Sequence, residues 1–230
     1  MNTLTVIVPF YNEEQFLSES IQRLLDNDIY EQIILIDDCS TDASPEIAKQ
    51  YSNEYKKIEY HITTNNGGKG KALAKGFSLV TSSHVVIHDA DLEYFPVDIV
   101  SMFDALNGHI NSLVLGSRFI GDLQRDGHYA RTYYANKIMS KFFSLVNLKN
   151  ITDVATCYKL MPTKFVKDLD IKENGFSIEI ELLSKYLKYN RSVIEVPISY
   201  DGRSYEEGKK IKTSDGFFYL LNTLKYRIFN

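Results

Sequence analysis

The chain has 230 residues, of which 44% are hydrophobic and 24% charged, and its formal net charge at pH 7 is −4. This length and composition suffice for one large domain with its own core or for two small ones, and one domain is the simpler expectation. The acidic balance excludes a global basic field that would gather nucleic acid, so any anion has to be bound by a local cluster of cations.

The first half of the chain alternates between apolar β-branched runs and helical patterns. Residues 3–10 are continuously apolar, as expected of a strand covered on both faces of a parallel sheet. Asn12 is predicted to cap a helix that begins at Glu13, and Asp42 or Ser44 to cap the next one. Further strands are expected at 32–38, 57–62 and 84–89, with helices at 39–51, 68–80 and 96–106. This succession predicts a doubly wound, mostly parallel α/β sheet with helices on both faces, whose ligands bind at the carboxyl ends of the strands.

After Asn107 the alternation is less regular. Strands are expected at 112–119, 157–162 and 192–200, and helices at 129–148, 177–190 and 214–229. The last helix is amphipathic, and its apolar side chains share one side: Phe217, Leu220, Leu221, Leu224 and Ile228.

Cysteine usage and hydropathy suggest where the protein works. Cys39 and Cys157 fit neither a disulfide framework nor a zinc spacing, and Cys157 is expected to be a small buried residue rather than a nucleophile. The first ten residues have the pattern of a strand rather than of a signal peptide, and the sequence contains no run of about 18 apolar residues that would span a bilayer. A cytoplasmic location is therefore expected.

Three carboxylates follow the fourth expected strand at alternate positions: Asp89, Asp91 and Glu93. On an extended strand they would share a face, where they repel one another unless a cation or protons compensate. A divalent cation is the economical answer, and such oxygen ligands suit Mg²⁺ or Mn²⁺, with phosphate oxygens completing the shell. The plainer alternative is that Asp89 and Asp91 end the strand and cap the helix near Pro96.

Polar loops follow the other expected strands, at 9–14, 37–42, 65–72 and 116–119, and should open on the same edge of the sheet. Asp37 or Asp38 is placed to accept hydrogen bonds from a base or a ribose. Lys69 and Lys71 belong to a glycine-rich loop at a helix N-terminus, which suits a phosphate. The loop lacks the Walker A spacing, and two solvated lysines are the alternative.

Eight segments, taken in order along the chain, resemble the inverting family 2 glycosyltransferases. They are "VIVPFYNEE", "IILIDDCSTD", "NNGGKGKALAKG", "VVIHDADLEYFP", "LVLGSRF", "ITDVATCYKLMP", "GFSIEIELL" and "IEVPISYDGRSYEEGKKI". More narrowly they resemble the dolichol-phosphate mannose synthase-like branch, which passes a sugar from a nucleotide diphosphate to a polyprenyl phosphate. The resemblance covers residues 3 to about 213. It implies a GT-A domain over 1–212, followed by a C-terminal helix at 213–230.

The resemblance also assigns roles to individual residues. The positions that hold the base and ribose are Pro9, Tyr11, Glu13, Ile36 and Asp38. The metal and diphosphate motif is matched by Asp89, Ala90 and Asp91, and Glu93 stands where the family often has Gln as a third metal ligand. Cations for the donor diphosphate or the acceptor phosphate are expected at Arg118, Arg131, Arg203 and Lys209. Asp153 matches an acidic position near the acceptor, where it would orient Arg118 or Arg203, although a simple cap is an equal alternative.

The implied reaction moves a sugar from a GDP- or UDP-sugar to a polyprenyl phosphate with the help of Mg²⁺ or Mn²⁺. This acceptor is already an anion, so it needs positioning more than a general base. A saccharide hydroxyl is the alternative acceptor, with Asp153 as the candidate base, and a non-catalytic nucleotide-binding module is the rival function. Residues 202–210 are expected to be a flap over the diphosphate. The last helix and the 142–148 end of the long helix are expected to lie against the cytoplasmic face of the membrane or a small membrane protein, or else on the domain's own core.

Overall fold

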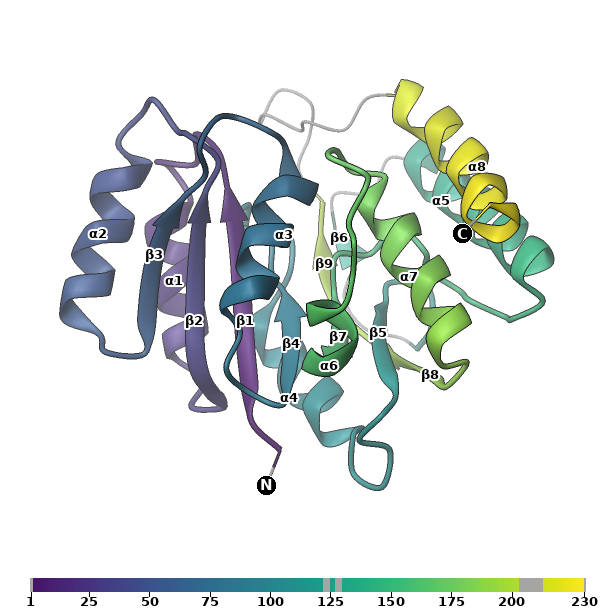
Figure 1. The fold of residues 1–230 in the computed structure, drawn as a ribbon, viewed down its shortest axis with the longest axis horizontal. Coiled ribbons are helices and arrows are strands. Elements are labelled where there is room, and N and C mark those ends of the chain that lie inside the picture. The colour runs from purple at the N-terminus through teal and green to yellow at the C-terminus, as the bar shows by residue number, and fades with distance from the viewer. Residues whose placement is uncertain (1, 122–124, 127–129, 203–212, 230) are drawn as a thin grey trace.

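A computed structural model describes residues 2–121, 125–126, 130–202 and 213–229 (Figure 1). One seven-stranded sheet runs through its centre in the order β3-β2-β1-β4-β7-β5-β8, and β6 pairs with β9 in a separate ribbon. The strands are β1 (Leu4–Phe10), β2 (Tyr30–Asp37), β3 (Ile58–Ile62), β4 (His84–Ile87), β5 (Leu113–Ser117), β6 (Arg125–Asp126), β7 (Lys159–Pro162), β8 (Val193–Pro197) and β9 (Tyr200–Asp201). In the large sheet β7 runs antiparallel to both of its neighbours, β4 and β5, and the other pairs are parallel. The predicted mostly parallel sheet is confirmed.

The centre of the sheet contains a topological switch point. β1 pairs in parallel with β2 on one side and with β4 on the other. The chain therefore runs outward from β1 to β2 and β3, and then returns to the far side of β1 as β4. Loops that follow β1 and β4 must diverge there, which leaves a crevice beyond the carboxyl ends of the strands.

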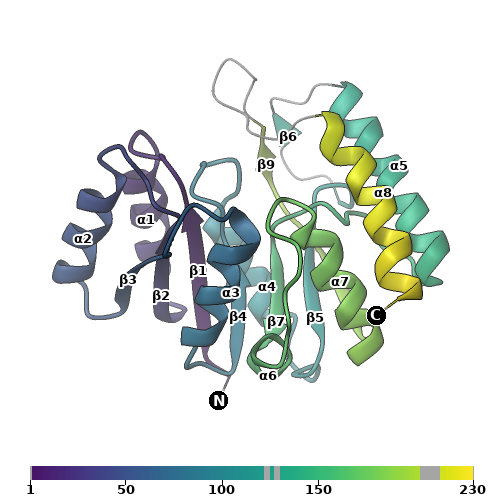
Figure 2. The same cartoon turned by 45° about the horizontal axis from the view of Figure 1, so that its top comes forward.

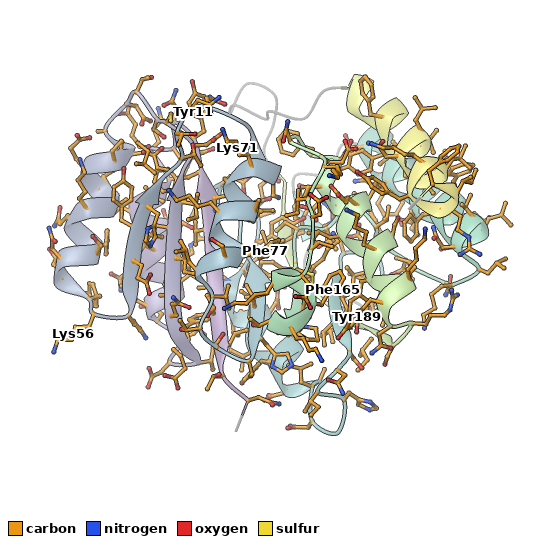
Figure 3. The ribbon with its side chains drawn as sticks, in the orientation of Figure 1. Tyr11, Lys56, Lys71, Phe77, Phe165 and Tyr189 are labelled. Atoms are coloured by element: carbon orange, nitrogen blue, oxygen red, sulfur yellow. The ribbon has the colours of Figure 1, made fainter. Side chains whose placement is uncertain are left out.

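Helices cover both faces of the sheet. On one face, α3 (Lys69–Leu79), α6 (Thr163–Lys167) and α7 (Ile178–Tyr189) bury apolar side chains that include Phe77 and Phe165, both labelled in Figure 3. On the other face, α1 (Leu17–Leu25), α2 (Ser44–Glu54) and α4 (Pro96–Asp104) enclose a second core. The long helix α5 (Ala130–Asn147) and the C-terminal helix α8 (Thr213–Ile228) lie side by side, and α8 also packs on α7 (Figures 1 and 2).

The predicted start of the first helix was wrong. α1 begins at Leu17, and its N-cap is Phe16 rather than Asn12. Asn12 instead adopts a positive φ of 52°, and its side-chain oxygen accepts a hydrogen bond from the Thr41 amide at 2.8 Å. A short amide side chain tolerates this backbone conformation, so Asn12 ties the loop after β1 to the loop after β2. The predicted caps of α2 were also wrong, because its N-cap is Ala43 and makes no side-chain hydrogen bond.

The C-terminal helix packs through a different face from the one its apolar pattern indicates. Leu221, Leu224 and Ile228 are 46%, 40% and 65% exposed, whereas Tyr219 and Tyr226 are buried. The helix therefore docks on the domain through tyrosines and leaves Leu221, Leu224 and Ile228 at the surface. Within the described residues, no helix has the length and apolar character needed to cross a membrane.

Candidate active site

A cavity of about 270 Å³ opens at the switch point. It collects side chains from the loops after β1, β2 and β4, from the start of α3, and from α7 and α8. The sequence-predicted residues that line it are Pro9, Tyr11, Glu13, Asp38, Lys69, Asp89, Ala90, Asp91, Glu93 and Arg118. Tyr11 and Lys71 are both labelled near the top of the molecule in Figure 3.

Five other predicted positions are not among the described lining residues: Ile36, Arg131, Asp153, Arg203 and Lys209. Ile36 was wrongly assigned to the nucleotide, because its side chain is fully buried in the core beneath α3 and does not line the cavity. The backbone of Arg131 belongs to α5, but its side chain lies outside the described part of the chain, as do Arg203 and Lys209. Most of the expected flap, 203–210, lies outside it as well.

The three carboxylates after β4 converge by a turn rather than along a strand. β4 ends at Ile87, and Leu92 adopts a positive φ of 62°, so the predicted extended arrangement was wrong. Glu93 is buried and accepts a 2.6 Å hydrogen bond from the hydroxyl of Tyr200, while Asp89 faces Lys69. Among the described residues there is no group of three His, Cys, Asp or Glu side chains arranged to hold a metal ion.

Lys69 is the centre of a buried, charge-balanced cluster. Its ammonium lies 2.7 Å from one carboxylate oxygen of Asp89 and 2.9 Å from Oε1 of Glu179. The other oxygen of Glu179 lies 2.6 Å from the ammonium of Lys159, whose side chain is fully buried. Burial by itself lowers the pKa of Lys69, but Asp89 and Glu179 raise that pKa well above its ordinary value, so the ammonium stays charged. The alternative of a solvated Lys69 is thereby excluded.

Asp38, rather than Asp37, lines the cavity. Its carboxylate accepts hydrogen bonds from the amides of Gly67 and Gly68, the latter at 2.6 Å, and therefore holds the glycine-rich loop in place. Asp37 is fully buried, and its two oxygens accept hydrogen bonds from the Ser40 amide and the Tyr60 hydroxyl.

Arg118 reaches the cavity as half of a buried ion pair. Its Nε and Nη2 donate to the two oxygens of Asp153 at 2.7 and 2.9 Å, and its guanidinium carbon lies 4.8 Å from the ring centre of Tyr200. Burial by itself lowers the pKa of Arg118, and Asp153 reverses this effect and raises that pKa. Asp153 is fully buried and does not line the cavity, so its carboxylate is poorly placed to act as a base.

Several lining residues received no role from the sequence. Glu179, Tyr94, Tyr200, Phe176 and Tyr219 come from four different parts of the chain. One signal in the sequence could have pointed to Glu179, which is a charged residue within a largely apolar stretch of α7. The same signal applies to its partner Lys159 in β7. Cys157 also lines the cavity and is 2% exposed; burial raises the pKa of its thiol, which keeps it protonated and unreactive.

Comparison with known proteins places this site in a family. Residues 5–170 match the model of glycosyl transferase family 2. The chain belongs to this family. It is 30% identical over 224 residues to the dolichol-phosphate mannosyltransferase of Pyrococcus furiosus, covering 94% of this chain and 61% of that protein. It is 27% identical over 218 residues to the dolichol-phosphate mannosyltransferase of Saccharomyces cerevisiae, covering 89% of this chain and 80% of that protein.

The chain spans less than two thirds of the length of the Pyrococcus furiosus protein. It also covers only 63% of the glycosyltransferase AglJ of Haloferax volcanii. Among solved structures it is similar to glucosyl-3-phosphoglycerate synthase from Mycobacterium tuberculosis, crystallised with Mn²⁺, UDP and glucosyl-3-phosphoglycerate. The TM-score is 0.74 at 17% identity, over 98% of this chain and 80% of the other. The predicted GT-A fold is confirmed by this likeness.

Replacing Asp153 by Ala should lower the free energy of unfolding by about 3–5 kcal/mol, because it leaves the buried Arg118 guanidinium without its counterion. Urea unfolding measures the change. The control is Glu19→Ala, which breaks the more exposed Arg23 pair and should cost no more than about 1 kcal/mol. A loss for Asp153→Ala as small as that of the control would contradict the buried pair.

Proposed function

We propose that this protein transfers a sugar from a nucleotide-diphosphate sugar to the phosphate of a polyprenyl lipid. Its family and its dolichol-phosphate mannosyltransferase relatives support this reaction class. The observation that carries the proposal is the single cavity in which Asp89 and Asp91 of the acidic motif meet Lys69 and Arg118. Carboxylates for a cation and cations for phosphates are the two groups that such a transfer requires at one place.

The charge of the cavity supports a divalent cation. In the part of the chain that the structure describes, its lining contains more carboxylates than cations: Glu13, Asp38, Asp89, Asp91, Glu93 and Glu179 against Lys69 and Arg118. A diphosphate would add further negative charge, so binding it there requires extra positive charge. Carboxylate oxygens fit Mg²⁺ or Mn²⁺, which usually take one or two of them together with phosphate oxygens.

We assign the cation to Asp91 together with Asp89 or Glu93. To bind it, Asp89 would have to leave Lys69, or Glu93 would have to leave the hydroxyl of Tyr200. When bound, such an ion neutralises the charge that develops on the leaving diphosphate. The donor's nucleoside is assigned to Asp38 and to Tyr11, whose ring is 37% exposed and offers a face for a base.

The transfer itself forms one bond and breaks one. An oxygen of the acceptor phosphate bonds to C1 of the sugar while the bond from C1 to the diphosphate oxygen breaks, and the nucleoside diphosphate leaves with the electron pair. Lys69 and Arg118 offer charged donors to these phosphates, and Arg131, Arg203 and Lys209 are proposed to add to them. The acceptor is already an anion, so no base is needed, which suits a site whose Asp153 is occupied by Arg118.

A lipid acceptor has to be reached at a membrane, and α5 and α8 offer a surface for this. We define the α5/α8 apolar surface by its exposed residues Tyr134, Ile138, Leu145, Phe218, Leu221, Leu224 and Ile228. The two helices lie side by side in Figures 1 and 2, and the α8 residue Tyr219 lines the cavity. We propose that this surface lies against the bilayer, which would bring the cavity close to the lipid phosphate.

Nucleotide binding tests the cation assignment. With Mn²⁺, the correct UDP- or GDP-sugar should raise the stability of the protein, by about 2.7 kcal/mol at a concentration 100-fold above its Kd. Asp91→Ala should abolish the metal-dependent part of this thermal shift, whereas Asp104→Ala, at an exposed position of α4, should keep it. A shift that survives intact in Asp91→Ala would exclude Asp91 as a ligand.

Product analysis tests the acceptor. With radiolabelled donor and vesicles that contain polyprenyl phosphate, label should enter the organic-extractable lipid. The double variant Leu221→Ser with Leu224→Ser should reduce this transfer at least about tenfold, because it removes apolar area from the bilayer contact, and should leave nucleotide binding unchanged. The control is Val97→Ser, which removes an exposed apolar side chain from α4 and should leave the transfer unchanged. Label that enters a saccharide, or nucleotide binding without transfer, would reject the lipid acceptor.

A further inference from the structure

The N-terminus of α3 is in contact with a segment that lies about 100 residues further along the chain. The amide of Gly70 donates a 2.8 Å hydrogen bond to the carbonyl oxygen of Asn174. A Cβ atom at Gly70 would lie 1.8 Å from the carbonyl oxygen of Glu173, and one at Gly68 would lie 2.5 Å from that of Asn174. These two positions accept only glycine because the backbone of residues 173–174 lies directly against them.

Lys69 stands between these two glycines. Its ammonium reaches Asp89 and Glu179 across the cavity wall, so its position depends on the backbone on either side of it. A displacement of residues 173–174 would remove the acceptor of the Gly70 amide and the backbone that packs against Gly68, while the Gly68 amide would stay bonded to Asp38. Lys69 would then lose part of the backbone support that places its ammonium beside Asp89.

Residues 172–175 are themselves held from two sides. On the first side, Glu181 of α7 accepts hydrogen bonds from the amides of Lys172 and Glu173 at 2.8 and 2.7 Å. On the second side, the carboxylate of Glu173 turns toward α8. There it lies 2.7 Å from the ammonium of Lys225 and accepts a hydrogen bond from the Tyr226 hydroxyl at 2.8 Å.

The α8 contact of Glu173 is complete on both oxygens, because Asn222 donates to the second one at 3.0 Å. Glu173 thus joins three side chains of one face of α8 to the segment that touches α3. One turn earlier on the same helix, the hydroxyl of Tyr219 donates to the carbonyl oxygen of Phe176 at 2.8 Å, and both of these residues line the cavity.

We propose that Glu173 is a positioning residue that couples the docking of α8 to the placement of Lys69. Through its carboxylate, the position of the C-terminal helix sets how firmly residues 173–174 press on Gly68 and Gly70, and so whether Lys69 stands beside Asp89 when the donor arrives. The consequence for donor binding rests on the proposed function, whereas the structural coupling does not. An acceptor surface on α5 and α8 would in this way be connected to the donor side of the cavity.

Amide hydrogen exchange tests the coupling in the full chain without any ligand. In Glu173→Ala, the amide of Gly70 should exchange roughly 5- to 10-fold faster than in the wild type, because the carbonyl that protects it is less firmly held. Glu173→Gln, which keeps one acceptor oxygen but loses the charge and the second acceptor, should exchange at a rate between those of the wild type and Glu173→Ala. Lys225→Met, which removes the ion pair and the contact of the ammonium with the Tyr226 ring but leaves the hydrogen bonds of Asn222 and Tyr226 to Glu173, should lie closer to the wild type. An unchanged Gly70 rate in Glu173→Ala overturns the proposal.

Donor kinetics test the consequence for function. Glu173→Ala should raise the KM for the nucleotide sugar by roughly 5- to 10-fold while changing kcat less, since the loss concerns binding of the diphosphate. Glu173→Gln should raise this KM by less than Glu173→Ala does. The control is Ile21→Val in the core under α1, which destabilises the protein away from this contact and should leave the donor KM unchanged.

The two tests separate the inference from the proposed function. If the wild type binds no nucleotide sugar, the proposed function fails, and the Gly70 exchange rate still decides the coupling. If the wild type binds the donor, and Glu173→Ala alters neither the donor KM nor the Gly70 rate, the coupling is wrong although the enzyme assignment stands. If Ile21→Val raises the donor KM as much as Glu173→Ala does, the effect is one of general stability, and the inference is overturned.

Discussion

A carboxylate that leaves water needs a cation, and this requirement organises the carboxyl edge of the sheet. Lys69 lies between Asp89 and Glu179, and Lys159 balances Glu179 from the interior. Arg118 and Asp153 form a second buried pair at the same cavity. These contacts hold the side chains of the cavity wall in fixed positions relative to one another in the protein without ligand. Counted over the described residues, the cavity lining nevertheless has more carboxylates than cations, which is the physical reason for proposing an added metal ion there.

The topology explains why these groups meet. The order β2-β1-β4 places the ends of three strands around one switch point, so loops separated by up to about eighty residues open into one cavity. The C-terminal helix belongs to this arrangement rather than standing apart from it. Tyr219 contributes to the cavity wall, and Tyr226 and Lys225 hold the segment that touches the glycine-rich loop. The helix presents Tyr219 and Tyr226 to the domain and leaves Leu221, Leu224 and Ile228 exposed, on the surface that is proposed above to contact lipid.

Much of the fold could be predicted from the sequence because the signals were local. The continuous apolar run of β1 and the shorter strand pattern of β3 were predicted to within one residue, and the acidic and glycine-rich loops followed strands whose ends were expected to share an edge. Local rules failed where a loop made distant contacts. Asn12 is a residue type that often caps helices, but its side chain accepts a hydrogen bond from the loop after β2. The expected strand 192–200 is divided between β8 and β9. The pairing of Lys159 with Glu179 joins a strand to a helix, and periodicity carries no information about such a partner. The same limit explains α8, since amphipathicity does not tell which face finds hydrogen-bonding partners.

The central claim is that the acidic turn after β4 binds a cation that in turn binds the diphosphate of a sugar nucleotide. A crystal structure of the protein with a nucleotide sugar and Mn²⁺ tests it most directly, because anomalous scattering locates the manganese. The account predicts manganese beside Asp91, bridging to the diphosphate, with Lys69 within contact distance of a phosphate oxygen. A donor bound away from the β1–β4 switch point, or manganese without a carboxylate from Asp89, Asp91 or Glu93, would contradict it.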